Sequence, residues 1–121
     1  MPDQKILIVD DDKDLLRLMS RHLVRAGFDV VTAQDGVSAV SVAKKEQPRV
    51  IVLDLGIPAG DGFRVLEMLQ NLIPVAHIPV VVLTARGAQA EATARSAGAA
   101  AFLQKPVSAN QLIETVRSVL N

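Results

Sequence analysis

Five residues of types that can do chemistry follow short apolar runs in this chain of 121 residues. They comprise three carboxylates, one hydroxyl and one primary amine, namely Asp10, Asp11, Asp54, Thr84 and Lys105. The apolar runs directly or shortly before them cover residues 6–9, 50–53, 80–83 and 100–103. If these runs are neighbouring parallel strands, their carboxyl ends lie at one edge of the sheet, where ligands bind in such folds. The pattern therefore predicts that the five side chains meet in one site.

Three crowded carboxylates repel one another and resist ionising unless a cation shares the space. A hard divalent cation suits such oxygen ligands, and Mg²⁺ is the best candidate because it also bridges to phosphate oxygens in phosphoryl-transfer sites. The residue types therefore indicate a magnesium site that takes part in phosphoryl chemistry.

Along the chain, apolar runs alternate with amphipathic stretches, which is typical of repeated strand and helix units. These strands and helices must position the five residues. We predict strands over residues 6–9, 28–32, 50–53, 80–83 and 100–103. Helices are predicted from residue 15 to a stop at Gly27, over 36–46, 61–72 and 88–97, and from an N-cap at Ser108 to residue 120. Right-handed crossovers then give an α/β fold with three layers, a doubly wound parallel sheet of five strands in the order 2-1-3-4-5.

The apolar residues of the helices predict how each one docks. We expect the third helix to pack on the sheet through one side, which is formed by Phe63, Leu66, Leu69 and Ile73. Asp61 is expected to cap this helix. The helix over 88–97 offers only alanines, which bury little area, so we expect the sheet to hold it loosely.

Composition limits the class of protein. Thirteen basic residues balance thirteen acidic ones, so no overall field attracts nucleic acid or an anionic membrane. The absence of cysteine excludes disulfides and thiolate metal sites. The N-terminus lacks a signal-peptide segment, and no apolar run is long enough to span a bilayer. We expect one cytoplasmic domain over residues 1–121, without membrane association or direct binding of nucleic acid.

Four motifs occur in order along the chain: K-I-L-I-V-D-D-D, V-L-D-L-G-I-P-A-G-D-G, V-V-L-T-A and K-P. From Lys5 to Leu120 the chain resembles a response-regulator receiver domain of two-component signalling, a family with a flavodoxin-like fold. The resemblance implies that Asp54 accepts a phosphoryl group with Mg²⁺ as cofactor. It also implies a phosphohistidine donor on a sensor histidine kinase or a histidine phosphotransfer protein.

The resemblance assigns a role to each residue of the site. Asp11, Asp54 and the main-chain carbonyl of Gly56 would bind the metal directly, and Asp10 would help through water. Lys105 would face the metal across the phosphoryl group, and Thr84 would donate its hydroxyl to a phosphoryl oxygen. Ala85 would leave room for the group and offer a backbone N–H. A cis peptide bond between Lys105 and Pro106 would aim the lysine.

The resemblance also implies a switch. Thr84 would turn toward the phosphoryl group while Phe102 moves inward, and the two would couple phosphorylation to the face formed by the fourth helix, the fifth strand and the fifth helix. Because Phe102 lacks a hydroxyl, burial alone would stabilise its inward state. The simpler interpretation of Phe102 is core packing.

Two other functions remain to be weighed from the residues themselves. An aspartate phosphotransferase of the haloacid dehalogenase type uses D-x-D, but the residue two positions after Asp54 is Gly56. A receiver fold that only binds other proteins, without phosphorylation, would not need Asp11, Asp54 and Lys105 together. Gly56 also leaves the phosphoryl group open to water, and Arg86 would instead screen it.

Overall fold

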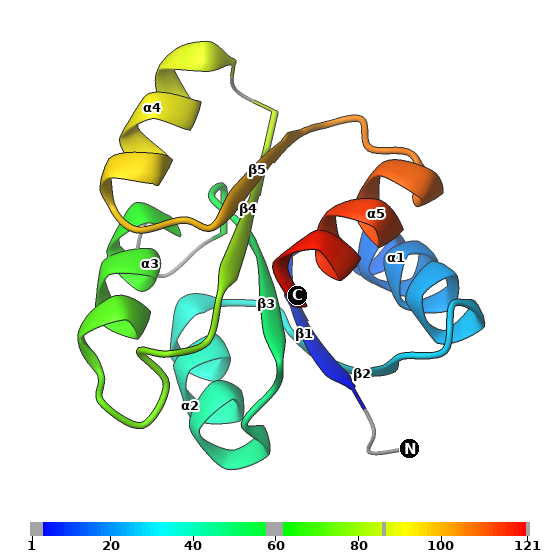
Figure 1. Ribbon diagram of the computed structural model, residues 1–121, viewed down its shortest axis with the longest axis horizontal. Helices are drawn as coiled ribbons and strands as arrows, with labels where there is room; N and C mark the ends of the chain where they lie inside the picture. Colours follow the sequence, from blue (N-terminus) through cyan, green and yellow to red (C-terminus); the bar gives the residue numbers. More distant parts are fainter. Residues whose placement is uncertain (1–3, 58–61, 86, 121) are drawn as a thin grey trace.

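Strands and helices alternate along the chain in the computed structural model, which describes residues 4–57, 62–85 and 87–120 (Figure 1). The strands are β1 (Lys5–Val9), β2 (Asp29–Ala33), β3 (Val50–Asp54), β4 (Val80–Thr84) and β5 (Ala101–Gln104). The helices are α1 (Lys13–Arg25), α2 (Gly36–Glu46), α3 (Gly62–Asn71), α4 (Ala88–Ser96) and α5 (Ala109–Leu120). Within the described ranges, no helix is long and apolar enough to cross a membrane.

The five strands form one parallel sheet in the order β2-β1-β3-β4-β5, which confirms the predicted doubly wound topology. The register explains why the polar residues gather. Val9 pairs with Leu53, so the next residues along the chain, Asp10 and Asp54, lie beside each other at the ends of neighbouring strands. Thr84 pairs with Gln104, so Lys105 comes directly after the end of the next strand.

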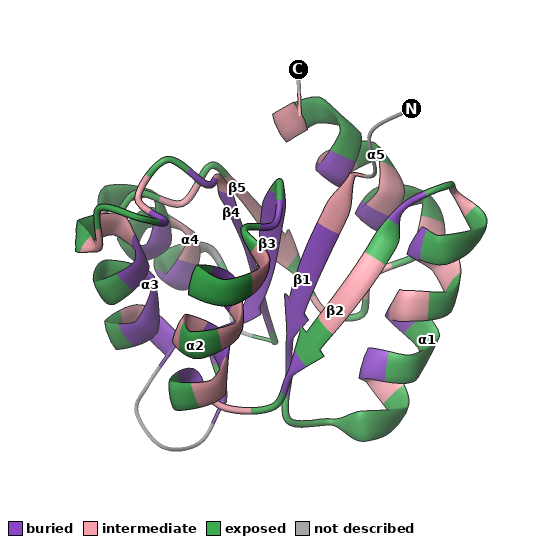
Figure 2. Cartoon of the chain, turned by 90° about the horizontal axis from the view of Figure 1, so that it is seen from below, coloured by how far each residue is buried: buried purple, intermediate pink, exposed green. Residues whose placement is uncertain are grey.

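Two helical layers cover the sheet (Figure 1). Helices α1 and α5 pack on one face, and α2, α3 and α4 pack on the other. The inner strands are built from Val, Ile and Leu, and β1, β3 and β4 are buried on both faces, as Figure 2 shows for β1 and β3. Aliphatic runs of this kind are what a parallel sheet covered on both sides requires. The carboxylates and Thr84 therefore lie at the ends of buried strands.

Side-chain caps mark where α1, α2 and α5 begin. Asp12 caps α1, because its Oδ1 accepts hydrogen bonds from the N–H groups of Asp14 and Leu15 at 3.0 and 3.1 Å. Asp35 caps α2 by accepting from the N–H of Ser38 at 2.8 Å. The predicted cap of α5 is confirmed, since Ser108 and Gln111 exchange hydrogen bonds in a capping box.

Some predicted boundaries were wrong by one residue or more. Strands β2 and β5 each begin one residue later than predicted. Ile73 does not face the sheet, because α3 ends at Asn71 and leaves Ile73 89% exposed. The prediction that Asp61 caps α3 lies outside the described residues.

Helix α4 packs on the sheet through alanines, of which Ala90 is 8% exposed and Ala94 is fully buried. Its loose attachment stays a prediction.

Candidate metal centre

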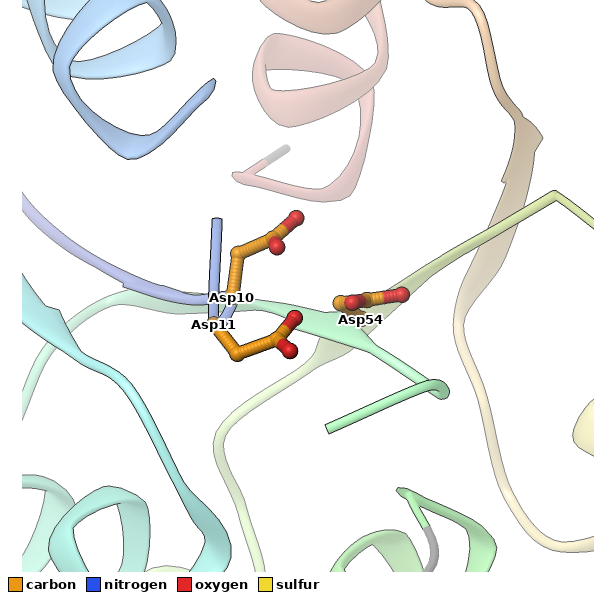
Figure 3. Close-up of side chains that lie close together, drawn as sticks. All are labelled: Asp10, Asp11 and Asp54. Carbon is orange, nitrogen blue, oxygen red and sulfur yellow. The ribbon is translucent and has the colours of Figure 1, made fainter. Parts of the chain in front are cut away.

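Three carboxylates converge at the carboxyl edge of the sheet. Asp10, Asp11 and Asp54 each offer one oxygen, and these oxygens lie within 4.8 Å of one another. Figure 3 shows the three side chains gathered beyond the ends of β1 and β3. Asp10 and Asp54 are buried, with 0% and 5% exposure, whereas Asp11 is exposed. The cluster is therefore anchored in the protein on one side and open to solvent on the other.

Backbone N–H groups hold the two buried carboxylates in place. Asp10 Oδ1 accepts a hydrogen bond from the N–H of Asp12 at 3.0 Å, and Asp54 Oδ1 accepts one from the N–H of Gly56 at 3.2 Å. Each contact spans two residues, as in the turns that Asp favours after a strand. The second oxygen of each carboxylate is left for other partners.

Lys105 supplies a cation to both buried carboxylates. Its Nζ lies 3.1 Å from Asp10 Oδ2 and 3.5 Å from Asp54 Oδ2. The main chain fixes its position, because the N–H of Lys105 donates to the carbonyl of Thr84 at 2.7 Å. The peptide bond between Lys105 and Pro106 is cis, as the resemblance implied.

The charges in this cluster affect one another. Burial raises the pKa of Asp10 above its usual value, and the charge of Asp54 adds to this, while the N–H of Asp12 and the ammonium of Lys105 oppose it. Burial alone would lower the pKa of Lys105, but the close contact with Asp10 and the charges of Asp10 and Asp54 raise it. Lys105 is therefore held as an ammonium, and Asp10 ionises reluctantly.

These residues fit a divalent cation. The buried Oδ2 of Asp10 has no well-aligned hydrogen bond, although Lys105 Nζ is close to it. Three carboxylates against one ammonium leave a formal excess of two negative charges when all are ionised. Hard oxygen donors with this excess charge match the preference of Mg²⁺. A Cβ at Gly56 would lie 3.7 Å from both carboxylate oxygens of Asp54, so the glycine keeps side-chain bulk away from them.

The remaining predicted residues lie on the next strands of the same edge. Thr84 ends β4 and is 4% exposed, and Ala85 follows it at the surface. Phe102 on β5 pairs with Val82, two residues before Thr84, and is half-buried against the core on the face of the sheet that α2, α3 and α4 cover. Because side chains alternate along a strand, Thr84 and Phe102 lie on the same face of the sheet. Arg86 lies outside the described residues.

Two features of the site were not predicted from the sequence. Asp12 belongs to the aspartate run, but it caps α1 and is not part of the carboxylate cluster. Gly62 is buried against Leu55, and a Cβ there would lie 2.3 Å from the Cα of Leu55. Its N–H donates to the Leu55 carbonyl at 3.0 Å, which ties the start of α3 to the residue after Asp54. Only the aspartate and glycine residue types hinted at these roles.

The fold and the site define an α/β domain with a cluster of three carboxylates and a facing ammonium at the carboxyl edge of a doubly wound sheet. The family described as Response regulator receiver domain matches residues 6–117. The chain belongs to this family, and it is a signalling domain of response regulators.

Relatives of known function are similar over nearly the whole chain. The DNA-binding dual master transcriptional regulator RpaA of Synechocystis sp. is 39% identical over 117 residues, which cover 96% of this chain and 48% of RpaA. The alkaline phosphatase synthesis transcriptional regulatory protein PhoP of Bacillus subtilis is 35% identical over 119 residues, covering 98% of this chain and 49% of PhoP. The chain thus spans about half the length of these relatives.

Solved structures share the whole fold. The chemotaxis response regulator CheY4 of Vibrio cholerae superposes with a TM-score of 0.91 at 29% identity, covering 97% of this chain and 98% of CheY4. A CheY-like response regulator receiver domain protein from Methanospirillum hungatei gives a TM-score of 0.90 at 26% identity, covering 98% of this chain and 94% of that protein.

Proposed function

We propose that this domain accepts a phosphoryl group on the carboxylate of Asp54. The observation that carries the proposal is the cluster of Asp10, Asp11 and Asp54, whose oxygens lie within 4.8 Å of one another and face the ammonium of Lys105. Transfer of a phosphoryl group depends mainly on positioning and on neutralising charge, and a cation on each side of the acceptor supplies both.

Mg²⁺ is the proposed cofactor. Asp11 and Asp54 would bind it directly together with the main-chain carbonyl of Gly56, and Asp10 would act through water. When bound, Mg²⁺ neutralises charge on the phosphoryl oxygens as they approach the acceptor. The exposed position of Asp11 leaves this side of the cluster accessible to both metal and donor.

In the transfer step, an oxygen of Asp54 attacks phosphorus in line with the leaving group. The bond from phosphorus to the donor nitrogen breaks, its electron pair returns to the imidazole, and an acyl phosphate forms on Asp54. Lys105 then pairs with a phosphoryl oxygen, Thr84 donates its hydroxyl to another, and the backbone N–H of Ala85 to a third. Gly56 offers no general acid or base, so we expect slow self-catalysed hydrolysis and no metabolic turnover.

The proposed donor is a sensor histidine kinase or a histidine phosphotransfer protein. A hollow of about 420 Å³ opens beside Lys105, and it is lined mainly by apolar residues of α1 and of the segment after Lys105. Leu18 within it is 46% exposed. An apolar surface next to the acceptor suits docking of a protein donor.

The proposed output is a change at the face formed by α4, β5 and α5. Thr84 and Phe102 share one side of the sheet, so a movement of the Thr84 hydroxyl toward the phosphoryl group would free space for the Phe102 ring. A downstream protein, or an output domain of the same protein, would respond to that change. The names of RpaA and PhoP describe transcriptional regulators. For this domain itself, we propose no contact with DNA or a membrane and a cytoplasmic location.

Phosphorylation of the purified chain with acetyl phosphate and Mg²⁺ tests the proposal. The mass of one phosphoryl group should appear on the wild type and on Asp14→Ala, and should be absent from Asp54→Ala. Asp14 is a matched control because it is exposed, close in sequence to the cluster and outside it. Failure of the wild type to incorporate phosphate would instead favour a binding module that is not phosphorylated. Rapid turnover of a generic phosphomonoester would favour a phosphatase.

A further inference from the structure

A groove of about 550 Å³ lies between α2 and α3, on the face of the sheet opposite α1 and α5. Figure 1 shows these two helices beside each other, and both start at the carboxyl edge of the sheet. The residues of this α2–α3 groove that matter here are Val37, Val40, Lys44, Lys45, Arg64 and Met68. The groove is separate from the hollow beside Lys105, which α1 borders.

Apolar side chains of the groove are open to solvent. Val37 is 74% exposed and Met68 is 47% exposed, and they belong to the five large hydrophobic residues that are exposed in the described part of the chain. Val40 lines the same groove and is half-buried. Exposed apolar side chains that gather in one hollow with a charged border are typical of a protein interaction site. Solitary exposed residues of the same type need no such explanation.

All ionisable side chains that line the groove are basic, namely Lys44, Lys45 and Arg64. Both lysines are exposed, and neither forms an ion pair with another described residue. Glu67 lines the neighbouring hollow on α3 and not this groove. The lysines suit the carboxyl end of α2, where the helix dipole favours a cation, and Arg64 adds a third positive charge from the first turn of α3.

The chemistry of the groove suits one kind of occupant. Val37, Val40 and Lys44 occupy positions i, i+3 and i+7 of α2, so they share one face of that helix over about 11 Å at 1.5 Å per residue. An apolar groove with a basic border is complementary to a helix that has an apolar face flanked by carboxylates. We propose that the α2–α3 groove binds an acidic amphipathic helix of a partner protein. Its apolar side chains contact Val37 and Met68, and its carboxylates face Lys44, Lys45 and Arg64.

The probe for this proposal is a fluorescein-labelled peptide of about 16 residues, long enough to fold on binding. It carries Leu at i, i+3 and i+7 and Glu at the flanking positions. One control peptide has Lys in place of Glu, and a second has the same composition with the Leu positions scrambled. Fluorescence anisotropy gives the affinity, and amide chemical shifts of the isotope-labelled protein locate the bound peptide. We expect the shifts to concentrate in residues 36–45 and 64–68.

Variants separate the apolar contact from the charged one. Val37→Glu should abolish binding, whereas Val24→Glu, at an apolar position on α1 that is also exposed (56%), should not change it. The double variant Lys44→Glu, Lys45→Glu should weaken binding about tenfold, because two exposed ion pairs become repulsive contacts. Arg21→Glu, Arg25→Glu is its matched control, since it changes the net charge equally on α1. Circular dichroism establishes that each variant is folded.

Three results would overturn the proposal. One is equal affinity for the acidic and the basic peptide, and another is binding that persists in Val37→Glu. The third is sedimentation that shows the wild type to dimerise and Val37→Glu to remain monomeric, which would assign the groove to a second copy of the chain.

Discussion

The ammonium of Lys105 lies closer to Asp10, at 3.1 Å, than to Asp54, at 3.5 Å. The lysine is therefore shared between the proposed acceptor and a neighbouring carboxylate. The side chain of Lys105 thus links Asp10 to Asp54.

We expect Asp10→Asn to weaken the binding of Mg²⁺ about tenfold, as changes near a metal site commonly do. Burial and the charge of Asp54 raise the pKa of Asp10, so its surroundings favour a neutral group. The metal-free variant should therefore be at least as stable as the wild type. Calorimetric titration and urea unfolding measure the two quantities, with Asp14→Asn as the control. A variant that binds Mg²⁺ as tightly as the wild type would contradict a role for Asp10.

Gly62→Ala should destabilise the fold by about 1–3 kcal/mol, the usual range for overpacking. The added Cβ would lie 2.3 Å from the Cα of Leu55, and backbone atoms on both sides cannot rotate away. We also expect shifted amide signals at Asp54 and Gly56, because Leu55 lies between them. Urea unfolding and NMR spectra check both effects. Gly87→Ala is the control, since a Cβ at Gly87 meets no atom within 4 Å, and equal losses in the two variants would exclude the steric cause.

Asp35→Asn should remove a pH-dependent part of the stability. Hydrogen bonds from Ser38 lower the pKa of Asp35, so the carboxylate stabilises the folded state above its pKa in the unfolded chain. This contribution is lost as the pH falls through the lowered pKa of the folded state. The wild type should therefore exceed Asp35→Asn in stability at pH 7, and the gap should close in acid. Urea unfolding at several pH values measures the gap, with Asp29→Asn as the control, and a gap that does not depend on pH would refute the explanation.

Gly56→Met should slow the loss of the phosphoryl group. A Cβ at Gly56 lies 3.7 Å from both oxygens of Asp54, so a longer side chain would cover the acyl phosphate and exclude water. The decay of the phosphorylated mass with time gives the rate. Identical decay in the variant and the wild type would show that the open space at Gly56 does not control hydrolysis.

Thr84→Val should uncouple phosphorylation from the α4 side of the sheet. With Mg²⁺ and beryllium fluoride, a phosphoryl mimic, we expect the wild type to change its amide exchange in the described residues between Gly87 and Phe102. The valine variant keeps the shape of the side chain without the hydroxyl and should lose this change. Exchange that is unaltered by the mimic in the wild type would reject the switch.

The sequence predicted the location of the site better than its internal contacts. Apolar runs that end at Asp10, Asp54 and Thr84 were enough, because parallel strands of a doubly wound sheet all end at one edge. The choice of Asp12 as the helix cap could not be predicted, since each aspartate of the run is a suitable cap by type. That choice depends on where the chain leaves β1.

Contacts between distant segments could not be predicted from the sequence either. Gly62 packs against Leu55 across a loop, so closely that an added Cβ would lie 2.3 Å from the Cα of Leu55, and no hydrophobic periodicity predicts this contact. The exposure of Ile73 was mispredicted because the helical pattern continues past Asn71, where the helix itself ends. Hydrophobic spacing indicates which face a helix buries, but its end is decided by local hydrogen bonds.

The hydrogen bond of 2.7 Å from the N–H of Lys105 to the carbonyl of Thr84 joins the two groups on the far side of the carboxylate cluster. Their main chains form a single joint between β4 and the turn that follows β5. We therefore expect a displacement of either residue on phosphorylation of Asp54 to displace the other residue and the edge strand β5 as well.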